Sequence, residues 1–333
     1  MNDRRSEEGT GYGVTPSAQS SIPEVSPVTH SPNQGCPICE GAFQPLSVMR
    51  RLKTARCPRC GHRVATHESE TASTLDYHRQ YEHGVFLDSL RATRKRQAKC
   101  IIQAIRRALP DCDQVLDYGA GRGWFLDACR DAGMRDVAAA DASAMAVEAA
   151  RARGITGLLV NDDGSNLDLA ALPFAPRVLT LLDVIEHFPP TELRPRIDRL
   201  LRALPSVQIV VVKVPVSSGP LYASATLMAR IGLGGALEQL YQVGTNPPHY
   251  NYFSRSSLQR LMKRCGLTPI EMFGDLDFEP RLLPDRVHLL RGLPGAVKWP
   301  ISWIAVALCR LLPTRDSMIC LSATVARSQP AEA

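Results

Sequence analysis

Residues 114–129 read QVLDYGAGRGWFLDAC, and this stretch decides the fold. A short apolar strand ends in Asp117, three glycines alternate with other residues, and a helical pattern follows. Glycines at this density let the backbone turn sharply and approach a ligand, because no Cβ intervenes. The start of the following helix offers free N–H groups. The stretch therefore predicts a strand, a ligand-binding loop and a helix.

The glycine spacing distinguishes between two cofactors. A dinucleotide-binding loop has the pattern G-x-G-x-x-G, whereas here Trp124 stands at the third-glycine position and Gly123 comes one residue earlier. The observed D-x-G-x-G-x-G resembles the first motif of class I S-adenosylmethionine (SAM) methyltransferases. The resemblance implies a SAM pocket with contacts from Asp117, Gly119, Ala120, Gly121 and Gly123.

Acids also follow the later predicted strands, in the order expected for this family. Residues 137–143 (VAAADAS), 158–164 (LLVNDDG) and 178–188 (VLTLLDVIEHF) each read as a strand running into polar residues. An acid after the second strand can accept hydrogen bonds from both ribose hydroxyls, and the family places an acid after the third strand beside the adenine. The resemblance therefore adds to the pocket Asp141, Ala142, Asp162 and Asp183, with Asn161 and Asp163 as alternatives to Asp162.

The alternation of strands and helices predicts an α/β fold with helices on both faces of a parallel sheet. The resemblance covers residues 111–275 and implies a Rossmann-like, doubly wound, mostly parallel sheet of seven strands. It extends to residues 249–267, where the pattern predicts a helix capped by Ser254 and ended by Gly266.

The rest of the chain divides by composition. Few large apolar residues precede residue 34, which predicts a disordered tail. The expected units are a tail at 1–33, a zinc-ribbon-like module at 34–68, a helical linker at 69–110, the SAM-binding core with a lid insertion at about 215–248, and a C-terminal extension at 276–333. That extension contains an apolar helix at 297–313 and a last, antiparallel strand at 318–325.

Four N-terminal cysteines predict a structural zinc site. Cys36 and Cys39 (CPIC) and Cys57 and Cys60 (CPRC) form two C-x2-C pairs with seventeen residues between them. Each pair can form a knuckle that presents two thiolates to one tetrahedral ion, and four thiolates leave no position for substrate. His62 or His67 in place of one cysteine is the minor alternative.

The turn after the fourth predicted strand carries the candidate catalytic residues. Methyl transfer from SAM needs an oriented nucleophile and a base for its proton. His187 is a base candidate because of its near-neutral pKa, Glu186 could orient it or act itself, and His249 could close over the same pocket. The alternatives are a structural role for the turn, or a magnesium site formed by Asp183, Glu186 and His187, as in similar turns of quinone-biosynthesis O-methyltransferases.

Composition limits the function classes. The 333 residues are 44% hydrophobic with a net charge of +6, which is ordinary for a globular protein and does not demand a nucleic-acid partner. No export signal or membrane-length apolar run is visible, so we expect a cytoplasmic protein whose cysteines bind metal. Basic residues around 50–63 and 91–107 are interpreted as a solvated face, with a phosphate-binding site as the alternative.

The expected function is methyl transfer from SAM to a small-molecule, glycan or lipid-linked acceptor, with oxygen as the first choice of acceptor atom. A zinc-containing RNA methyltransferase and a non-catalytic binding module remain alternatives. The segment 297–313 is expected to pack on the domain, with peripheral membrane contact as the alternative.

Overall fold

The computed structural model describes residues 35–48, 52–67, 84–161, 164–232, 234–243, 248–278, 299–300, 303–304, 307 and 315–324. The expected tail at 1–33, most of the apolar helix at 297–313, and Asp162 with Asp163 lie outside the described residues. None of the described helices combines the length and the apolarity that a bilayer crossing demands.

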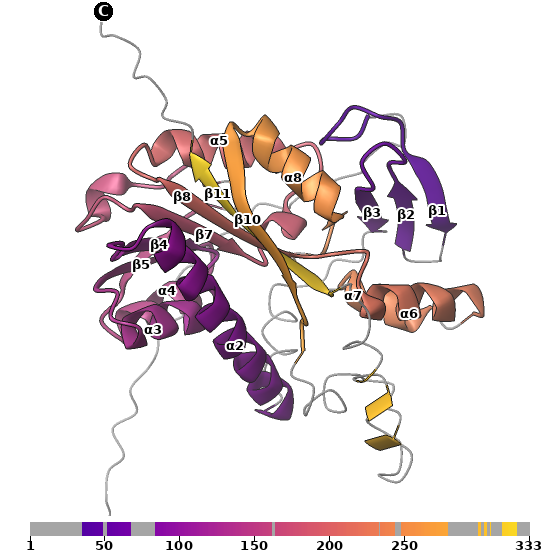
Figure 1. Ribbon diagram of the computed structural model, residues 1–333, viewed down its shortest axis with the longest axis horizontal. Coiled ribbons are helices and arrows are strands. Elements are labelled where there is room, and N and C mark those ends of the chain that lie inside the picture. The colour runs from indigo at the N-terminus through magenta and orange to yellow at the C-terminus, as the bar shows by residue number, and fades with distance from the viewer. Residues whose placement is uncertain are drawn as a thin grey trace, which may run out of the picture.

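A seven-stranded sheet forms the centre of the molecule, with the order β10-β11-β8-β7-β4-β5-β6 (Figure 1). Strands β4 to β8 run parallel, whereas β11 is antiparallel to both β8 and β10. The predicted fold class is therefore confirmed, including the antiparallel last strand. The strands are β4 (Gln114–Tyr118), β5 (Asp136–Asp141), β6 (Thr156–Leu159), β7 (Val178–Leu182), β8 (Ile209–Pro215), β10 (Leu267–Asp275) and β11 (Ser317–Thr324).

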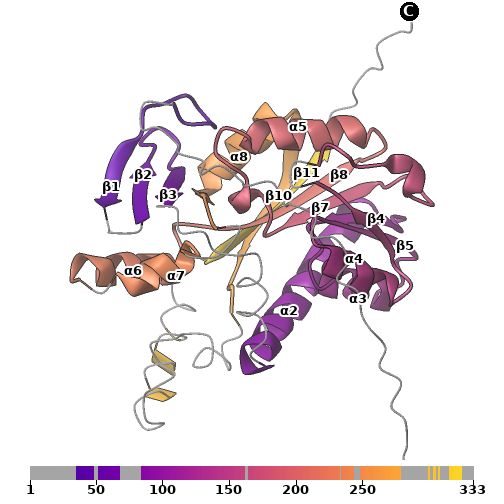
Figure 2. The ribbon, with the colours of Figure 1, turned by 180° about the vertical axis from the view of Figure 1, so that it is seen from behind.

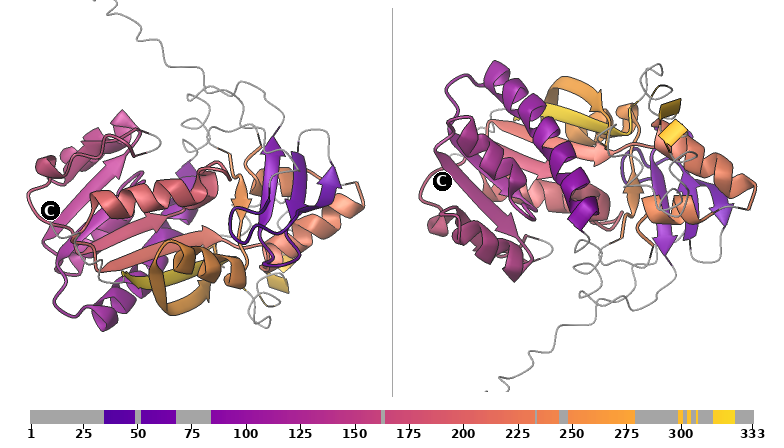
Figure 3. Two further views of the ribbon diagram at one scale, coloured as in Figure 1. Left: turned by 90° about the horizontal axis from the view of Figure 1, so that it is seen from above. Right: turned by 90° about the horizontal axis from the view of Figure 1, so that it is seen from below.

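Helices cover both faces of this sheet, and each face has its own apolar core (Figure 3). One face carries α5 (Leu193–Ala203) and α8 (Arg255–Arg264), and the other carries α2 (Gly84–Ala108), α3 (Trp124–Asp131) and α4 (Ala144–Arg151). Short 3-10 helices, η1 (Leu169–Ala171) and η2 (Ile185–His187), lie before and after β7.

Helix α8 begins and ends where its sequence predicts. The Ser254 hydroxyl accepts a hydrogen bond from the backbone N–H of Ser257, and the Ser257 hydroxyl accepts one from the backbone N–H of Ser254. Gly266 follows the helix with a φ of 72°, which suits a glycine after a helix end. This helix packs its buried stripe of Leu258, Leu261 and Met262 against the sheet.

A second, four-stranded sheet contains the N-terminal ribbon, with the order β1-β2-β3-β9. Strands β1 (Gln44–Val48), β2 (Leu52–Arg56) and β3 (Arg63–His67) come from the ribbon, whereas β9 (Asn251–Tyr252) comes from the core and pairs with β3. The ribbon is thus joined to the core by main-chain pairing (Figure 2).

The insertion after β8 forms α6 (Pro220–Arg230) and α7 (Gly235–Leu240). An apolar cluster joins these helices to the ribbon sheet; its members include Leu52, Ala65, Tyr222, Leu237, Tyr241 and Tyr252. The insertion therefore packs on the ribbon as well as following the carboxyl end of β8. Its action as a lid stays a prediction.

Candidate functional site

The glycine loop after β4 adopts a backbone that other residues would strain. Gly119, Gly121 and Gly123 have φ values of 77°, 51° and 68°, all in the left-handed region. A Cβ on Gly119 would lie 2.4 Å from Cγ2 of Val184, in the turn after β7. Among the described residues, none lies within 4 Å of a Cβ built on Gly121, so the loop is open on that side. The loop thus connects two strand ends and leaves room for a ligand.

Asp141, at the end of β5, faces this loop. Its Oδ2 accepts a hydrogen bond of 2.7 Å from the backbone N–H of Gly121, and its Oδ1 accepts one of 2.8 Å from Ser143. A carboxylate oxygen has a second acceptor position, so the oriented group can still take two ribose hydroxyls. The residues present therefore fit SAM, and the chain neighbours Ala120 and Ala142 are partly exposed and exposed.

Asp117 lies beneath the loop rather than at its surface. Its side chain is buried, and Oδ1 accepts a hydrogen bond of 2.6 Å from the Thr180 hydroxyl. Burial raises the pKa of Asp117 to about 7, and the nearby charge of Asp141 adds to the rise. This geometry favours support of the loop from below, and a direct contact with SAM stays a prediction.

A buried charge network occupies the neighbouring strand ends. Lys213, on β8, is 1% exposed and donates to Oδ1 of Asp183 at 2.6 Å and to Oδ1 of Asp277 at 2.8 Å. Arg94, from α2, pairs with the same two acids. Asp183 itself has a φ of 58°, a conformation that a non-glycine residue holds only when its surroundings fix it. Each oxygen of this carboxylate already pairs with a cation, Oδ1 with Lys213 and Oδ2 with Arg94. The expected contact of Asp183 with the cofactor stays a prediction.

Sequence reasoning missed three members of this network: Arg94, Lys213 and Asp277. Of these three residues, Lys213 is recognisable in the sequence, because it interrupts the otherwise apolar strand IVVVKVP. A lysine with both sheet neighbours apolar needs an acid partner. Arg94 and Asp277 lie 183 residues apart in the chain, so no local pattern connects them.

The structure brings the three expected catalytic residues together. Ligand-type atoms of Glu186, His187 and His249 all lie within 4.8 Å of one another. Nδ1 of His187 donates to the carbonyl of Pro248 at 3.0 Å, and the two imidazoles meet edge to face with ring centroids 4.7 Å apart. Burial raises the pKa of Glu186 well above its usual range, and the charge of Asp183 adds to the rise. Burial, with His187 nearby, lowers the pKa of His249 well below its usual range.

The turn that carries this cluster is held by Asn251 of β9. Its side-chain amide donates to the carbonyl of Phe188 at 2.6 Å. The preceding residue, Tyr250, donates its backbone N–H to the backbone carbonyl of Glu186 at 2.9 Å. The N-terminal ribbon also contacts Asn251, because Nε2 of His62 lies 3.2 Å from Oδ1 of Asn251. His62 therefore points toward the turn and away from the role of a substitute zinc ligand.

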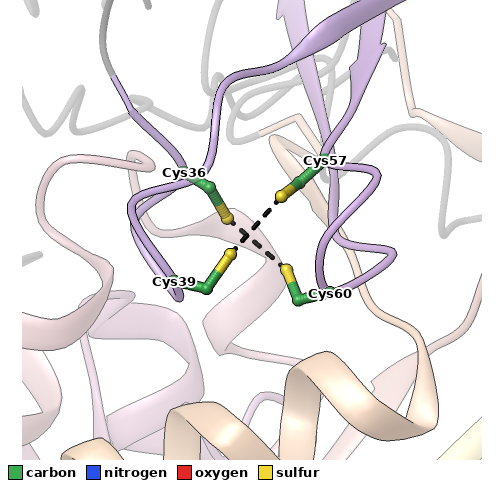
Figure 4. A group of neighbouring side chains, drawn as sticks. All are labelled: Cys36, Cys39, Cys57 and Cys60. Atoms are coloured by element: carbon green, nitrogen blue, oxygen red, sulfur yellow. Dashed lines mark hydrogen bonds between the residues drawn. The ribbon is translucent and has the colours of Figure 1, made fainter.

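The four ribbon cysteines converge on one point (Figure 4). The sulfurs of Cys36 and Cys60 lie 3.6 Å apart and those of Cys39 and Cys57 lie 3.4 Å apart. A tetrahedral zinc ion with Zn–S distances of ~2.3 Å separates its sulfurs by about 3.8 Å, so the four residues fit this ion after a small expansion. All four side chains are buried, and no disulfide joins the cysteines that the structure describes.

Comparisons with known proteins point in one direction. The family described as "Methyltransferase domain" matches residues 90–272. A SAM-dependent methyltransferase from Archaeoglobus fulgidus shares 16% identity, with 68% of this chain and 94% of that chain covered and a TM-score of 0.42.

Two further solved structures are similar to the chain. Magnesium protoporphyrin IX methyltransferase from Synechocystis PCC 6803 shares 15% identity, covering 76% and 95% of the two chains with a TM-score of 0.45. The 1,6-didemethyltoxoflavin-N1-methyltransferase of Burkholderia thailandensis shares 16%, covering 85% and 99% with a TM-score of 0.46. No curated protein matches the chain.

Proposed function

The chain belongs to the methyltransferase family, and from this premise we propose that it transfers the methyl group of SAM to a hydroxyl of a small-molecule, glycan or lipid-linked acceptor. One observation carries the proposal. The open glycine loop with Asp141 and the cluster of Glu186, His187 and His249 lie at the carboxyl ends of adjacent strands. Ligands of such sheets bind at these ends, so a donor and an acceptor can meet there.

The cofactor half would bind SAM through Asp141 and the backbone of the glycine loop. SAM supplies a methyl group on a positively charged sulfur, which departs as a neutral thioether. The protein therefore has no leaving group to protonate. Its residues have to orient the acceptor, exclude water and remove one proton.

His187 is the proposed base. Its Nδ1–H is fixed by the carbonyl of Pro248, which leaves the lone pair of the neutral ring on Nε2. The ring is half-buried at the edge of the cluster, so it can reach an acceptor hydroxyl from the pocket side. Glu186 and His249, which are more deeply buried, would set its position.

The acceptor surroundings favour a molecule with apolar parts. His249 packs against Tyr252, whose ring in turn contacts Tyr222 and Tyr241. These three rings are buried and their hydroxyls bond one another or the carbonyl of Leu240, so they form an apolar support behind His249. The acceptor turn also reads Asp183-Val184-Ile185-Glu186, in place of the Asn/Asp-Pro-Pro-aromatic motif of many nucleic-acid base methylators.

We propose structural zinc for the four cysteines. Thiolates from two knuckles close the coordination shell, which excludes substrate from the ion. The zinc would hold the ribbon loops that carry His62 and the carbonyl of Cys60, to which Ser254 and Ser256 donate. A reducing compartment such as the cytoplasm is proposed as well, because no disulfide joins the cysteines in the part of the chain that the structure describes.

Calorimetric titration with SAM tests the cofactor half. We expect micromolar affinity for the full chain and a loss of at least about 100-fold in Asp141→Ala, because two charge-assisted hydrogen bonds disappear. The matched control is Asp136→Ala, at the opposite end of the same strand, which should stay within about threefold. Unchanged affinity in Asp141→Ala would refute the pocket.

Labelled SAM then tests the acceptor half. Hydroxylated small molecules, nucleotide sugars, lipid-linked sugars and total RNA would be incubated with the zinc-loaded chain. Label on a hydroxylated small molecule or sugar, reduced at least about 100-fold in His187→Gln with SAM affinity retained, is the expected result. Label on RNA alone would overturn the proposed acceptor class.

A further inference from the structure

Glu186 is a carboxylate in an unusual position. Its side chain is fully buried, and within the described part of the chain neither of its oxygens has a hydrogen-bond partner. Asp117 is also deeply buried, but it accepts a hydrogen bond from Thr180. A buried acid without any donor is strongly unfavourable and calls for an explanation, such as an ion that the surrounding residues would bind.

Nearby cations do not supply the missing partner. Lys213 and Arg94 are the positive groups that act on Glu186, and both pair with Asp183 and Asp277. The attraction that they exert on Glu186 is weaker than the effect of burial. The carboxylate therefore lacks an ion-pair partner within the network that otherwise neutralises this region.

Two imidazoles approach the carboxylate at distances suited to a shared ion. The ligand-type atoms of Glu186, His187 and His249 lie within 4.8 Å of one another. Ligands of one ion lie about 3–4 Å apart when each is ~2.1 Å from it. The spacing thus agrees with three ligands around one ion.

A hydrogen bond orients the ring of His187 as in known metal sites. His187 donates from Nδ1 to the carbonyl of Pro248 at 3.0 Å, which leaves the lone pair on Nε2. A metal-bound histidine almost always donates its other ring N–H to such a group, because this bond fixes the tautomer and aims the lone pair. The buried carboxylate of Glu186 and the oriented ring of His187 are therefore two independent observations that point to a metal.

We propose that Glu186, His187 and His249 form a second metal site, for a divalent transition-metal ion such as zinc or cobalt. Two imidazoles and one carboxylate favour these ions over magnesium, which prefers oxygen ligands. Asp183, the acid that the magnesium alternative requires, is held by Lys213 and Arg94. Coordination would occupy the Nε2 lone pair of His187, because Nδ1 donates to Pro248. In the metal-bound chain the ion, which keeps a position open for an acceptor oxygen, would therefore lower the pKa of the acceptor hydroxyl in place of the histidine base. This last role rests on the proposed function, whereas metal binding does not.

Cobalt titration of the full, zinc-loaded chain tests the site. A weak chelator would first remove loosely bound metal, with one zinc per chain verified by atomic emission. We expect one further equivalent of Co²⁺ to bind with visible d–d bands and without the intense near-ultraviolet band of cobalt thiolate. A spectrum with the thiolate band would mean exchange into the cysteine site, and it would overturn the proposal, as would the absence of binding.

Three variants identify the ligands. Glu186→Gln and His249→Gln should each weaken the second cobalt site by at least about 100-fold and abolish its stabilisation of the chain against heat. Asp316→Asn is the matched control, since Asp316 is also a buried acid with one unbonded oxygen but lies outside the cluster. Equal cobalt affinity in all three variants would overturn the proposal.

Folding and the proposed function are separated within the same experiment. Glutamine has nearly the shape of glutamate and no charge, so Glu186→Gln should fold and bind SAM like the parent chain. Loss of SAM binding in Asp141→Ala alone tests the cofactor pocket and leaves the metal site unaffected. Failure of the metal site with SAM binding intact would refute this inference and not the proposed function.

Discussion

The proposed site at the carboxyl ends of the strands has a cofactor half and an acceptor half, and the two are built from different kinds of contact. The cofactor half, at β4 and β5, uses backbone N–H groups and one partly exposed acid from residues close in sequence: Gly121 and Asp141 are 20 positions apart. The acceptor half, at β7, β8 and β9, uses buried charges from distant segments, with 183 positions between Arg94 and Asp277. The difference teaches that the proposed SAM-binding half is specified locally, whereas the proposed acceptor half depends on tertiary structure.

Loss of the proposed zinc should have the largest effect, and it should destabilise the acceptor half far more than the cofactor half. The double substitution Cys36→Ser and Cys57→Ser removes two ligands, and metal-linked folding free energies of such sites are on the order of 10 kcal/mol. The acceptor half should lose its support, because His62 and β3 contact β9. Atomic emission, thermal unfolding and SAM calorimetry would measure the effects.

The cofactor half should survive this change. We expect zinc loss and a lowered thermal midpoint, with SAM affinity within about threefold of the parent. A large loss of SAM affinity would mean that the ribbon supports both halves, and it would contradict their independence.

Deleting one buried cation should have the next largest effect. Lys213→Met leaves Asp183 and Asp277 with a single shared cation, and breaking a buried ion pair typically lowers the free energy of unfolding by roughly 3–5 kcal/mol. The matched variant in the cofactor half is Arg153→Met, whose partner is Asp127. Both members of that pair are about one-third exposed, so less than about 1 kcal/mol is expected. Urea unfolding of the two variants measures the contrast, and equal losses would contradict it.

A pH series tests the protonation of the buried Asp117 in the cofactor half. The pKa of Asp117 is raised to about 7 in the folded chain from an ordinary value of 3.8. Between these pH values the folded state holds a proton that the unfolded state releases, so the free energy of unfolding falls as pH rises. Asp117→Asn does not titrate, and relative to the parent it should gain roughly 4 kcal/mol between pH 4 and pH 8.

Urea unfolding at several pH values would measure this gain. The exposed acid of α3, Asp131, gives the control variant Asp131→Asn, which should follow the parent at every pH. A parallel course for Asp117→Asn and the parent would show that Asp117 is ionised throughout.

The smallest effect is expected from the link between ribbon and turn. Asn251→Ala leaves buried carbonyls and His62 without a partner amide, which should lower the free energy of unfolding by about 1–3 kcal/mol. Gln208→Ala, which removes an exposed amide just before β8 that accepts from Arg177, should change it by less than about 0.5 kcal/mol. Affinity for SAM should stay unchanged in both, and a drop in Asn251→Ala would link the two halves.

The sequence predicted the backbone of the glycine loop because its conformation depends on residues close in the chain. The alternation of Gly119, Gly121 and Gly123 requires a left-handed backbone at each position, and the structure has it. The cysteine spacing likewise predicted a cluster that the structure forms. Within the acceptor half, the grouping of Glu186 with His187 and His249 was expected from their roles around a SAM pocket and not from a local sequence pattern.

The remaining features had no local pattern to predict them. Arg94 reads as one of many basic residues on a helix, and only the fold brings it to Asp183. The two residues of β9 are too short for a strand pattern, so the extension of the ribbon sheet by the core came from the structure alone. Lys213 was visible as an anomaly but its partners were not.

The pairing of β3 with β9 has a consequence for synthesis on the ribosome. His62 and Asn251 are 189 residues apart, and at ~5–20 residues per second the later one emerges roughly 10–40 seconds after the first. During that interval the ribbon has knuckles able to take up metal but an open edge at β3. Ion uptake would therefore precede closure of the sheet, and a nascent chain arrested before β9 should expose that edge to chaperones.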